Sequence, residues 1–283
     1  HQVLDNNWIF YAKGGEYRKW YGNIDLVVDW TSSAINFYKT NQTSNMIKEK
    51  YWFKDGITYT SLTSSINGFR YLPANGVFDI KGPSIIDLEA RNYCLGYFNT
   101  CISNYVLKLL NPTITLQVKD VKNNPIIFSE THKPRIDTLV EENIKISKID
   151  WDSFETSWDF ERHPFLAMND KNKEKHGKTV TKISDSFGLW QAYANIAFRI
   201  LKQNEEELNR IFIEIYGLQE ELTPEVEDKD VTVRKADLTR DVKSFISYAV
   251  GCMFGRYSLD VDGLAYAGGE WDSSKYKTFI PDT

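Results

Sequence analysis

The pattern of hydrophobic and polar positions in the first part of the chain predicts β-strands joined by turns. Strands are expected over residues 8–12, 25–30, 69–72 and 77–80. Each stretch has β-branched or aromatic residues bounded by polar turn residues. Asn67-Gly68 and Asn75-Gly76 are typical hairpin turns, so residues 57–86 are predicted to form a meander.

Helical periodicity is clearest where apolar residues recur at three- and four-residue steps, at Leu95, Phe98, Ile102, Tyr105, Val106 and Leu109. This spacing predicts one amphipathic helix that faces a core. Asn111-Pro112 should end it, because proline disfavours helical geometry in the residue before it. A β-strand is then predicted over residues 113–118.

Further helices are predicted from the same periodicity and from capping residues. They span residues 32–38, 45–53, 139–146, 189–216 and 237–254. The fold class is therefore α+β, with a β-rich N-terminal domain that includes core helices and a mainly helical C-terminal domain. The predicted domains are residues 1–148 and 184–283, and residues 149–183 form a strap between them.

Composition indicates a globular protein, since 42% of the 283 residues are hydrophobic. The chain has no apolar run of about 18 residues and no signal-peptide pattern, so we expect a cytoplasmic location. It starts at His1 without a methionine, and this suggests a piece of a longer protein.

Cysteine and histidine spacing gives no metal-binding pattern. Cys94, Cys101 and Cys252 are dispersed and odd in number, which favours free thiols. His132, His163 and His176 show no zinc spacing either, so no metal is expected.

Charge is unevenly distributed along the chain, whose net charge is -5. Residues 1–128 carry 13 basic and 10 acidic residues, whereas the remainder carries 21 and 29. Any DNA-facing surface should therefore lie in the first half. The acidic second half should face solvent, another domain or a protein partner.

A cluster of cationic and aromatic residues lies near the N-terminus, at Lys13, Tyr17, Arg18, Lys19, Trp20 and Tyr21. Arg18 and Lys19 are candidates for phosphate contact, and Trp20 and Tyr21 are candidates for base or sugar stacking. The alternative is a loop whose aromatic rings pack in the core while its cations reach solvent.

A second candidate surface is the hydroxyl-rich stretch that contains Arg70. Thr60, Ser64, Ser65 and Arg70 could read base edges, with Arg70 donating to a guanine in the major groove. Alternatively, Arg70 could form a salt bridge with Asp79 across the predicted hairpin.

Residues 93–125, YCLGYFNTCISNYVLKLLNPTITLQVKDVKNNP, resemble the target-recognition domain of type IIG and related adenine DNA methyltransferases. Residues 13–30, KGGEYRKWYGNIDLVVDW, narrow the resemblance to the PglX family of BREX phage-defence methyltransferases. Residues 157–164, 204–226 and 240–272 resemble the same family. The resemblance covers nearly the whole chain.

The resemblance implies a fragment that reads double-stranded DNA for a methyltransferase acting on adenine N6 with S-adenosylmethionine. Lys119 and Lys122 join Arg18 and Lys19 as candidates for phosphate positioning. The chain shows neither the Pro-Pro-aromatic motif nor the glycine-containing cofactor turn of such enzymes. No catalytic residue or cofactor is therefore expected here, and the fragment alone should be inactive. Its expected partners are DNA, an upstream methyltransferase domain of the same polypeptide and other BREX proteins.

Two other functions remain open from the sequence. The acidic helical half could be a protein-interaction module that docks another component of the defence complex. Asp79-Ile80-Lys81 has the Asp-x-Lys ending of a metal-dependent nuclease core, although so short a motif often arises by chance.

Overall fold

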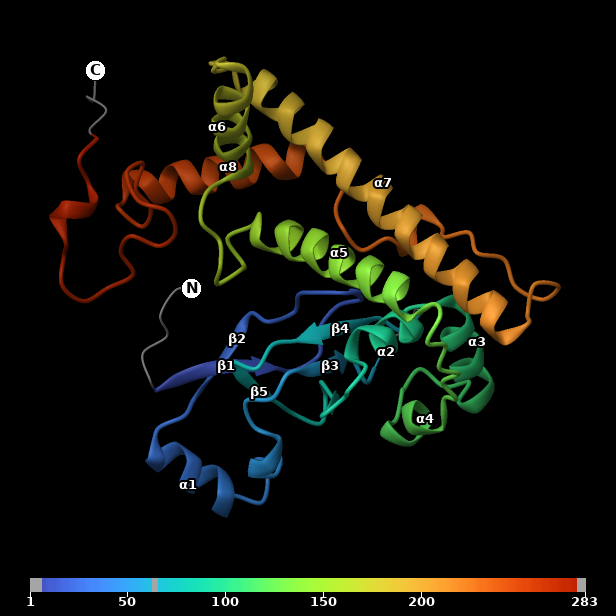
Figure 1. Cartoon of the computed structure of the whole chain (residues 1–283). Coiled ribbons are helices and arrows are strands. Elements are labelled where there is room, and N and C mark those ends of the chain that lie inside the picture. The colour runs from blue at the N-terminus through green and yellow to red at the C-terminus, as the bar shows by residue number, and fades with distance from the viewer. Residues whose placement is uncertain (1–6, 63–65, 279–283) are drawn as a thin grey trace. The chain divides into compact units, whose positions relative to one another are not determined.

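The computed structural model describes residues 7–62 and 66–278, which form two compact units (Figure 1). The first, here called the sheet unit, comprises residues 7–148 and 199–233. The second, the helical unit, comprises residues 149–198 and 234–278. Each unit is built from two separate stretches of the chain.

One small sheet of the sheet unit has the strand order β2-β1-β5. Its central strand, β1 (Trp8–Ala12), pairs antiparallel with β2 (Leu26–Asp29) and parallel with β5 (Gly76–Phe78). These strands confirm the predictions for residues 8–12, 25–30 and 77–80 to within two residues at each end.

The other small sheet has the order β4-β3-β6 and is antiparallel throughout. It comprises β3 (Gly56–Tyr59), β4 (Phe69–Leu72) and β6 (Ser84–Ile86). Strand β3 is buried along its whole length, so this sheet lies in the interior of the unit.

The predicted meander over residues 57–86 is wrong at its centre, because β4 and β5 belong to different sheets. Strand β5 pairs with β1 instead, and Gly76 makes this possible. A Cβ at Gly76 would lie 2.3 Å from the carbonyl oxygen of Phe10. Asn75-Gly76 therefore permits close strand approach and does not form a hairpin between β4 and β5.

The region after β2 is less helical than predicted. Helix α1 (Ser32–Thr40) is present, but its N-cap is Thr31, whose hydroxyl accepts a hydrogen bond from the Ala34 amide. The helix predicted over residues 45–53 is wrong, since only the short 3-10 turn η1 (Glu49–Tyr51) forms there. Asn45 and Phe53 have positive φ angles of 47° and 52°, which a helix does not allow.

The single helix predicted from the Leu95 to Leu109 periodicity is two helices, α2 (Arg91–Phe98) and α3 (Cys101–Leu110). Thr100 separates them, because its hydroxyl accepts from the Ser103 amide and so begins a new helix. The apolar periodicity continued through this cap and concealed the break.

The strand predicted over residues 113–118 is also wrong. Helix α4 (Val118–Asn123) begins there, because Gln117 and Asp120 form a reciprocal capping box. Before this helix, Thr115 makes an isolated antiparallel bridge with Leu62.

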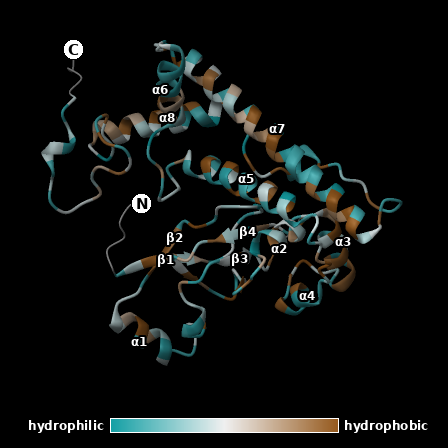
Figure 2. Ribbon diagram, viewed as in Figure 1, coloured by the Kyte–Doolittle hydropathy of each residue, from teal (hydrophilic) through white to brown (hydrophobic). Residues whose placement is uncertain are grey.

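Two long helices complete the sheet unit: α5 (Lys133–Asp152) as far as residue 148, and the second half of α7 (Ile183–Tyr216). Tyr97 on α2 packs against Phe212 of α7 with ring centroids 5.5 Å apart. Asn204 of α7 donates to the Asn143 side chain of α5 at 2.9 Å. The predicted helices over 139–146 and 189–216 are therefore present and longer than expected. Hydrophobic positions are visible along α7 and on α3 in Figure 2.

The helical unit contains α6 (Pro164–His176), the first half of α7 and α8 (Leu238–Met253). Its core includes a cluster around Phe165, Trp190 and Ala194. The predicted helix over residues 237–254 is confirmed, with Asp237 as its N-cap, whereas α6 was not predicted. Two further 3-10 turns are η2 (Asp228–Asp230), in the sheet unit, and η3 (Ser273–Lys275).

The α+β class is confirmed, with strands in the N-terminal part and helices dominating the C-terminal part. The division into units differs from the predicted domains 1–148, 149–183 and 184–283. The reason is that residues 199–233 fold with the N-terminal stretch, while residues 149–198 fold with residues 234–278. In the described part of the chain, no helix combines the length and apolar character that a membrane span requires.

Candidate nucleic-acid interface

Four of the six residues in the cationic and aromatic cluster predicted to face DNA lie in the interior of the sheet unit. Arg18 is 8% exposed, Lys19 3%, Trp20 0% and Tyr21 9%. Side chains this buried cannot touch a duplex in this conformation. The expectation that they form an exposed surface is therefore wrong, and the alternative of a core-packed loop describes them better.

Lys19 and Trp20 share one acceptor, the carboxylate of Glu205 on α7. The Lys19 ammonium pairs with Glu205 Oε2, and the Trp20 indole donates to Oε1 at 2.7 Å. Burial raises the pKa of Glu205, while Lys19 and Trp20 act in the opposite direction. This buried pair attaches the N-terminal segment to a helix that lies more than 180 residues away in the sequence.

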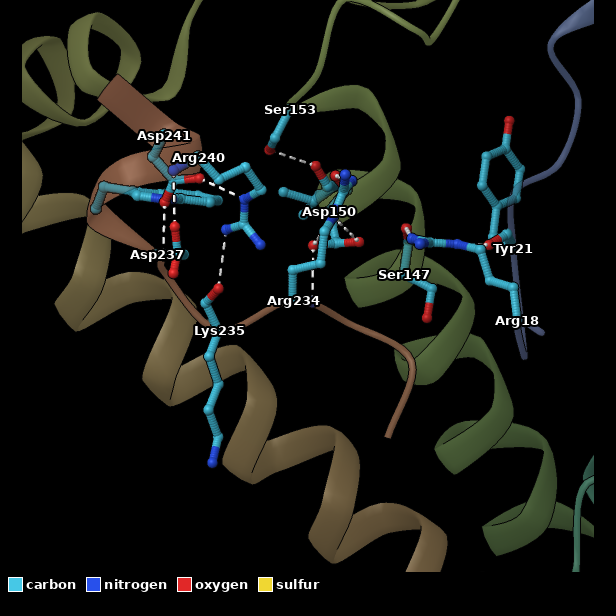
Figure 3. Close-up of polar contacts among 12 residues, drawn as sticks. Arg18, Tyr21, Ser147, Asp150, Ser153, Arg234, Lys235, Asp237, Arg240 and Asp241 are labelled. Carbon is cyan, nitrogen blue, oxygen red and sulfur yellow. Dashed lines mark hydrogen bonds and ion pairs between the residues drawn. The ribbon is translucent and has the colours of Figure 1, made fainter. Parts of the chain in front are cut away.

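Arg18 is held by backbone carbonyl groups. Its Nε donates to the Tyr21 oxygen at 2.8 Å, and Nη2 donates to the Ser147 oxygen of α5 at 3.4 Å (Figure 3). The Lys148 ammonium lies 5.2 Å from the centroid of the Tyr21 ring. The guanidinium therefore satisfies interior acceptors and does not project toward solvent.

Arg70 is also buried, with 1% of its surface exposed. It donates to the Arg18 carbonyl and to the Thr60 hydroxyl, both at 3.3 Å. Its Nε has no hydrogen-bond partner among the described residues. Burial, with the nearby charge of Arg18, lowers the pKa of Arg70 to about 10.

Neither sequence-based interpretation of Arg70 fits these contacts. A guanine cannot reach a side chain that is fully buried. The salt bridge to Asp79 is also wrong, because the expected hairpin does not form and Asp79 has other partners. Asp79 Oδ2 accepts from the Tyr11 hydroxyl at 2.9 Å, and Oδ1 accepts from the Lys81 and Gly82 amides at 2.7 and 3.0 Å.

The candidate interface lies instead on four loops of the sheet unit, here called the loop surface. They are residues 13–15, 60–62, 80–81 and 113–115. Thr60 donates to the Gly15 carbonyl at 3.1 Å, and the Ser61 amide donates to the Lys81 carbonyl at 3.3 Å. Leu62 bridges Thr115, so residues 60–62 connect the other three loops.

The glycines of the first loop allow this close packing. Gly14 and Gly15 have φ angles of 95° and 116°, which favour glycine. A Cβ at Gly14 would lie 2.8 Å from the Lys81 carbonyl oxygen. The backbone of the loop surface is therefore fixed although its side chains reach solvent.

Exposed cations occur on the loop surface and on the helix that follows it. They are Lys13, Lys81, Lys119 and Lys122. In residues 7–62 and 66–278, none of the four forms an ion pair. Lysines without carboxylate partners are suited to bind phosphate groups.

The site candidates from the sequence thus have three different outcomes. Lys119, Lys122 and the half-buried Thr60 lie on or beside the loop surface and remain candidates. Ser64 and Ser65 lie outside the described residues. Arg18, Lys19, Trp20, Tyr21 and Arg70 are too buried to contact DNA in this conformation. Lys13 belonged to the predicted cluster but was not singled out for phosphate contact, and neither was Lys81, although each directly precedes a glycine, a signal of an exposed turn.

Many acidic residues of the second half of the chain belong to the same unit as the N-terminal stretch. Residues 199–233 carry ten acidic and four basic residues, and they belong to the sheet unit. Some of this charge is used internally, as Glu205 pairs with Lys19 and Glu207 pairs with Arg135. Among the described residues, no group of three His, Cys, Asp or Glu side chains is arranged to hold a metal ion.

Polar side chains in the helical unit also form hydrogen bonds within the protein, as the buried cations of the sheet unit do. Arg234 Nη2 donates to the Asp150 carbonyl at 2.7 Å, and Arg240 Nε donates to Asp241 Oδ1 at 2.7 Å (Figure 3). The Trp190 indole donates to the other Asp241 oxygen at 2.9 Å. Burial lowers the pKa of His163 to about 4, and its Nδ1 accepts from the Phe165 amide that starts α6.

Comparison with known proteins gives two relatives. The adenine-specific methyltransferase PglX of Lacticaseibacillus casei (strain Zhang) is 45% identical over 291 residues, which cover 100% of this chain and 24% of the relative. The chain is a homologue of the C-terminal part of BREX adenine-specific methyltransferases. The methyltransferase BrxX of Escherichia coli O9:H4 (strain HS) is 28% identical over 93% of this chain and 22% of its own length.

The chain therefore spans about a quarter of the length of the curated relatives it matches. No known family profile matches it. The similarity to PglX extends over both the sheet unit and the helical unit.

Proposed function

We propose that this chain recognises DNA for a methyltransferase that modifies adenine N6 in phage defence. Two observations support this. The relatives are named as adenine-specific methyltransferases, and the loop surface with α4 presents four exposed lysines without ion pairs. The proposal depends mainly on these lysines, because they are exposed cations of the described sheet unit. They lie on or next to loops that bear hydroxyl groups and are held together by hydrogen bonds.

In this proposal the lysines position the duplex by binding phosphates, and hydroxyl groups of the loops read base edges. Thr60, Ser61, Thr113 and Thr115 all lie on the loop surface. Phosphate contacts set register, whereas base-edge contacts provide specificity. Hydrogen bonds between the loops, such as that from Thr60 to the Gly15 carbonyl, hold their backbone in place.

The salt dependence of DNA binding tests this function. Each phosphate contact contributes a slope of about -0.9 in a plot of log affinity against log salt. A Lys13→Ala, Lys81→Ala double variant should reduce the magnitude of this slope by up to about 1.8, because two phosphate contacts are removed. Lys145→Ala is a matched control, because Lys145 is an exposed lysine of α5 distant in sequence from the loop surface. Equal slopes for all three proteins would contradict the proposal.

Methyl transfer and S-adenosylmethionine binding are assigned in this proposal to the rest of the polypeptide. Support comes from the relatives, of whose length about three quarters lies outside the match. The chain alone should transfer no methyl group from S-adenosylmethionine to DNA, while the whole protein should do so. Measured transfer by the chain alone would contradict this assignment.

A second candidate function is docking of another protein domain, and exposed apolar side chains favour it. Leu109 is 69% exposed, Ile114 62% and Leu62 59%, at the end of α3 and in the adjoining loops. The occupant we propose is the methyltransferase domain of the same polypeptide. In the whole protein, Leu109→Asp, on α3 and outside the loop surface, should abolish methylation but leave DNA binding by this chain unchanged. Retained methylation would exclude such docking.

A further inference from the structure

An aromatic hollow lies beside the β2-β1-β5 sheet, and its lining includes Tyr11 and Asp79, whose hydrogen bond is described above. It has a volume of about 220 Å³ and is lined by the half-buried rings of Tyr11, Trp30, Tyr38 and Trp52, together with Met46. Trp30 and Trp52 meet edge to face with centroids 4.8 Å apart. This volume is below the roughly 300 Å³ at which pockets for drug-sized ligands begin, and it suits a single flat ring system.

A more polar hollow of about 350 Å³ adjoins the first, and the two share Tyr38, Met46 and Trp52. Lys39 and Lys48 line the second hollow. Lys39 pairs with Glu49, whereas Lys48 is exposed and has no ion pair within the described ranges. An aromatic wall thus continues into a site with an available positive charge.

The polar groups of the aromatic hollow do not favour a cation. Its carboxylate, Asp79, already accepts three hydrogen bonds, from the Tyr11 hydroxyl and from two backbone amides. The Tyr38 hydroxyl has no hydrogen bond in the described part of the chain, so it is free to donate to or accept from a ring nitrogen or carbonyl.

We infer that the two hollows bind one nucleotide, with its base against Trp30 and Trp52 and its phosphate at Lys48. Aromatic walls stack on any base through its π-face, and an unpaired lysine complements the phosphate. The nucleotide has two conceivable sources, a base extruded from DNA or a free nucleotide. The first source rests on the proposed DNA-binding function, whereas the second does not.

The test uses 2-aminopurine, a fluorescent base that stacked tryptophan quenches. The free deoxynucleoside monophosphate should be quenched on titration with the 283-residue chain. Trp52→Ala should weaken its affinity at least about fivefold, in keeping with the loss of one stacking contact. Lys48→Ala should weaken binding of the monophosphate but not of the nucleoside. Trp8→Ala is the matched control, because Trp8 is exposed on β1 and does not line either hollow.

A second variant distinguishes loss of the binding site from misfolding of Trp52→Ala. Val28→Phe fills the aromatic hollow from its wall without removing a ring, and it should also abolish quenching. Circular dichroism and the salt dependence of duplex binding should stay unchanged in both variants.

The source is identified with a duplex that carries 2-aminopurine at a mismatch, since an unpaired base is extruded most easily. Quenching there that is lost in Trp52→Ala shows an extruded base as the ligand. Quenching of only the free nucleotide shows the second source. Salt-dependent duplex binding without any Trp52-dependent quenching would overturn the pocket and leave the DNA-binding function standing. Nucleotide quenching without duplex binding would contradict the DNA-binding function and leave the nucleotide pocket standing.

Discussion

Two sets of cations in the sheet unit have the same chemistry and opposite environments. The buried set comprises Arg18, Lys19 and Arg70, and the exposed set comprises Lys13, Lys81, Lys119 and Lys122. Each buried cation has acceptors from distant segments, such as Glu205 on α7 and the Ser147 carbonyl on α5. No exposed one has an ion-pair partner in the described residues.

This difference shows that a cluster of cations and aromatic rings does not by itself indicate a nucleic-acid surface. A cation can be buried when the fold supplies a carboxylate or carbonyl groups at hydrogen-bonding distance. A cation that finds none stays exposed and keeps its charge available to a ligand. The partners thus separate structural cations from candidate binding cations.

The difference between buried and exposed cations is tested most directly at the buried ion pair of Lys19 and Glu205. Glu205→Ala leaves the Lys19 ammonium buried without a counter-charge, so the free energy of unfolding should fall by about 3 to 5 kcal/mol. Glu207→Ala is the matched control two residues along α7, because its pair with Arg135 is more exposed. That variant should lose at most about 1 kcal/mol. Similar losses in denaturant unfolding would show that burial does not distinguish the two pairs.

Buried His163 in the helical unit extends the comparison to a basic side chain that is neutral at pH 7 because burial lowers its pKa. The pKa of His163 is lowered to about 4, against about 6.5 in an unfolded chain. The unfolded state therefore binds the extra proton between these values, and stability is lost as pH falls from about 6.5 to 4. The loss should reach at most about 3 kcal/mol.

His163→Asn should keep the hydrogen bond that starts α6 but remove the titration. Unfolding of the variant between pH 4 and 7 should therefore vary less steeply with pH than that of the wild type. An unchanged pH dependence would assign the effect to other groups.

Local patterns predicted most elements of the fold because the strands and long helices depend on neighbouring residues. The break at Thr100 was missed because a cap can interrupt a helix without disturbing its apolar periodicity. The pairing of β5 with β1 was missed because Gly76 also fits a hairpin turn. Such choices depend on residues far away in the sequence.

The candidate site was harder to predict for the same reason. Nothing near Lys19 indicates that Glu205, 186 residues later, would bury it. Thr60 could be selected because it lies in a hydroxyl-rich stretch, whereas Lys119 and Lys122 were selected from the family resemblance. The assembly of four loops into one surface depends on tertiary contacts, such as the bridge between Leu62 and Thr115.

The exposed set can be tested on α4, where Lys119 and Lys122 are exposed and form no ion pair with any described residue. A Lys119→Ala, Lys122→Ala double variant should change the free energy of unfolding by no more than about 0.5 kcal/mol. Its DNA affinity should fall and its salt slope should flatten by up to about 1.8. Isothermal unfolding and binding titrations at several salt concentrations measure both. Loss of stability without a change in slope would place these lysines with the structural cations.

The smallest effect on DNA binding is expected at Arg70, where the sequence had suggested a contact with guanine. Arg70→Met removes the charge but keeps an apolar side chain of similar length, so it also relieves the unpaired Nε. Stability should stay within about 2 kcal/mol of the wild type. Site-specific DNA binding should be unchanged, because the side chain is 1% exposed. A variant that folds normally but loses discrimination at one base pair would show that Arg70 reaches DNA after a conformational change, and the division between buried and exposed cations would then fail.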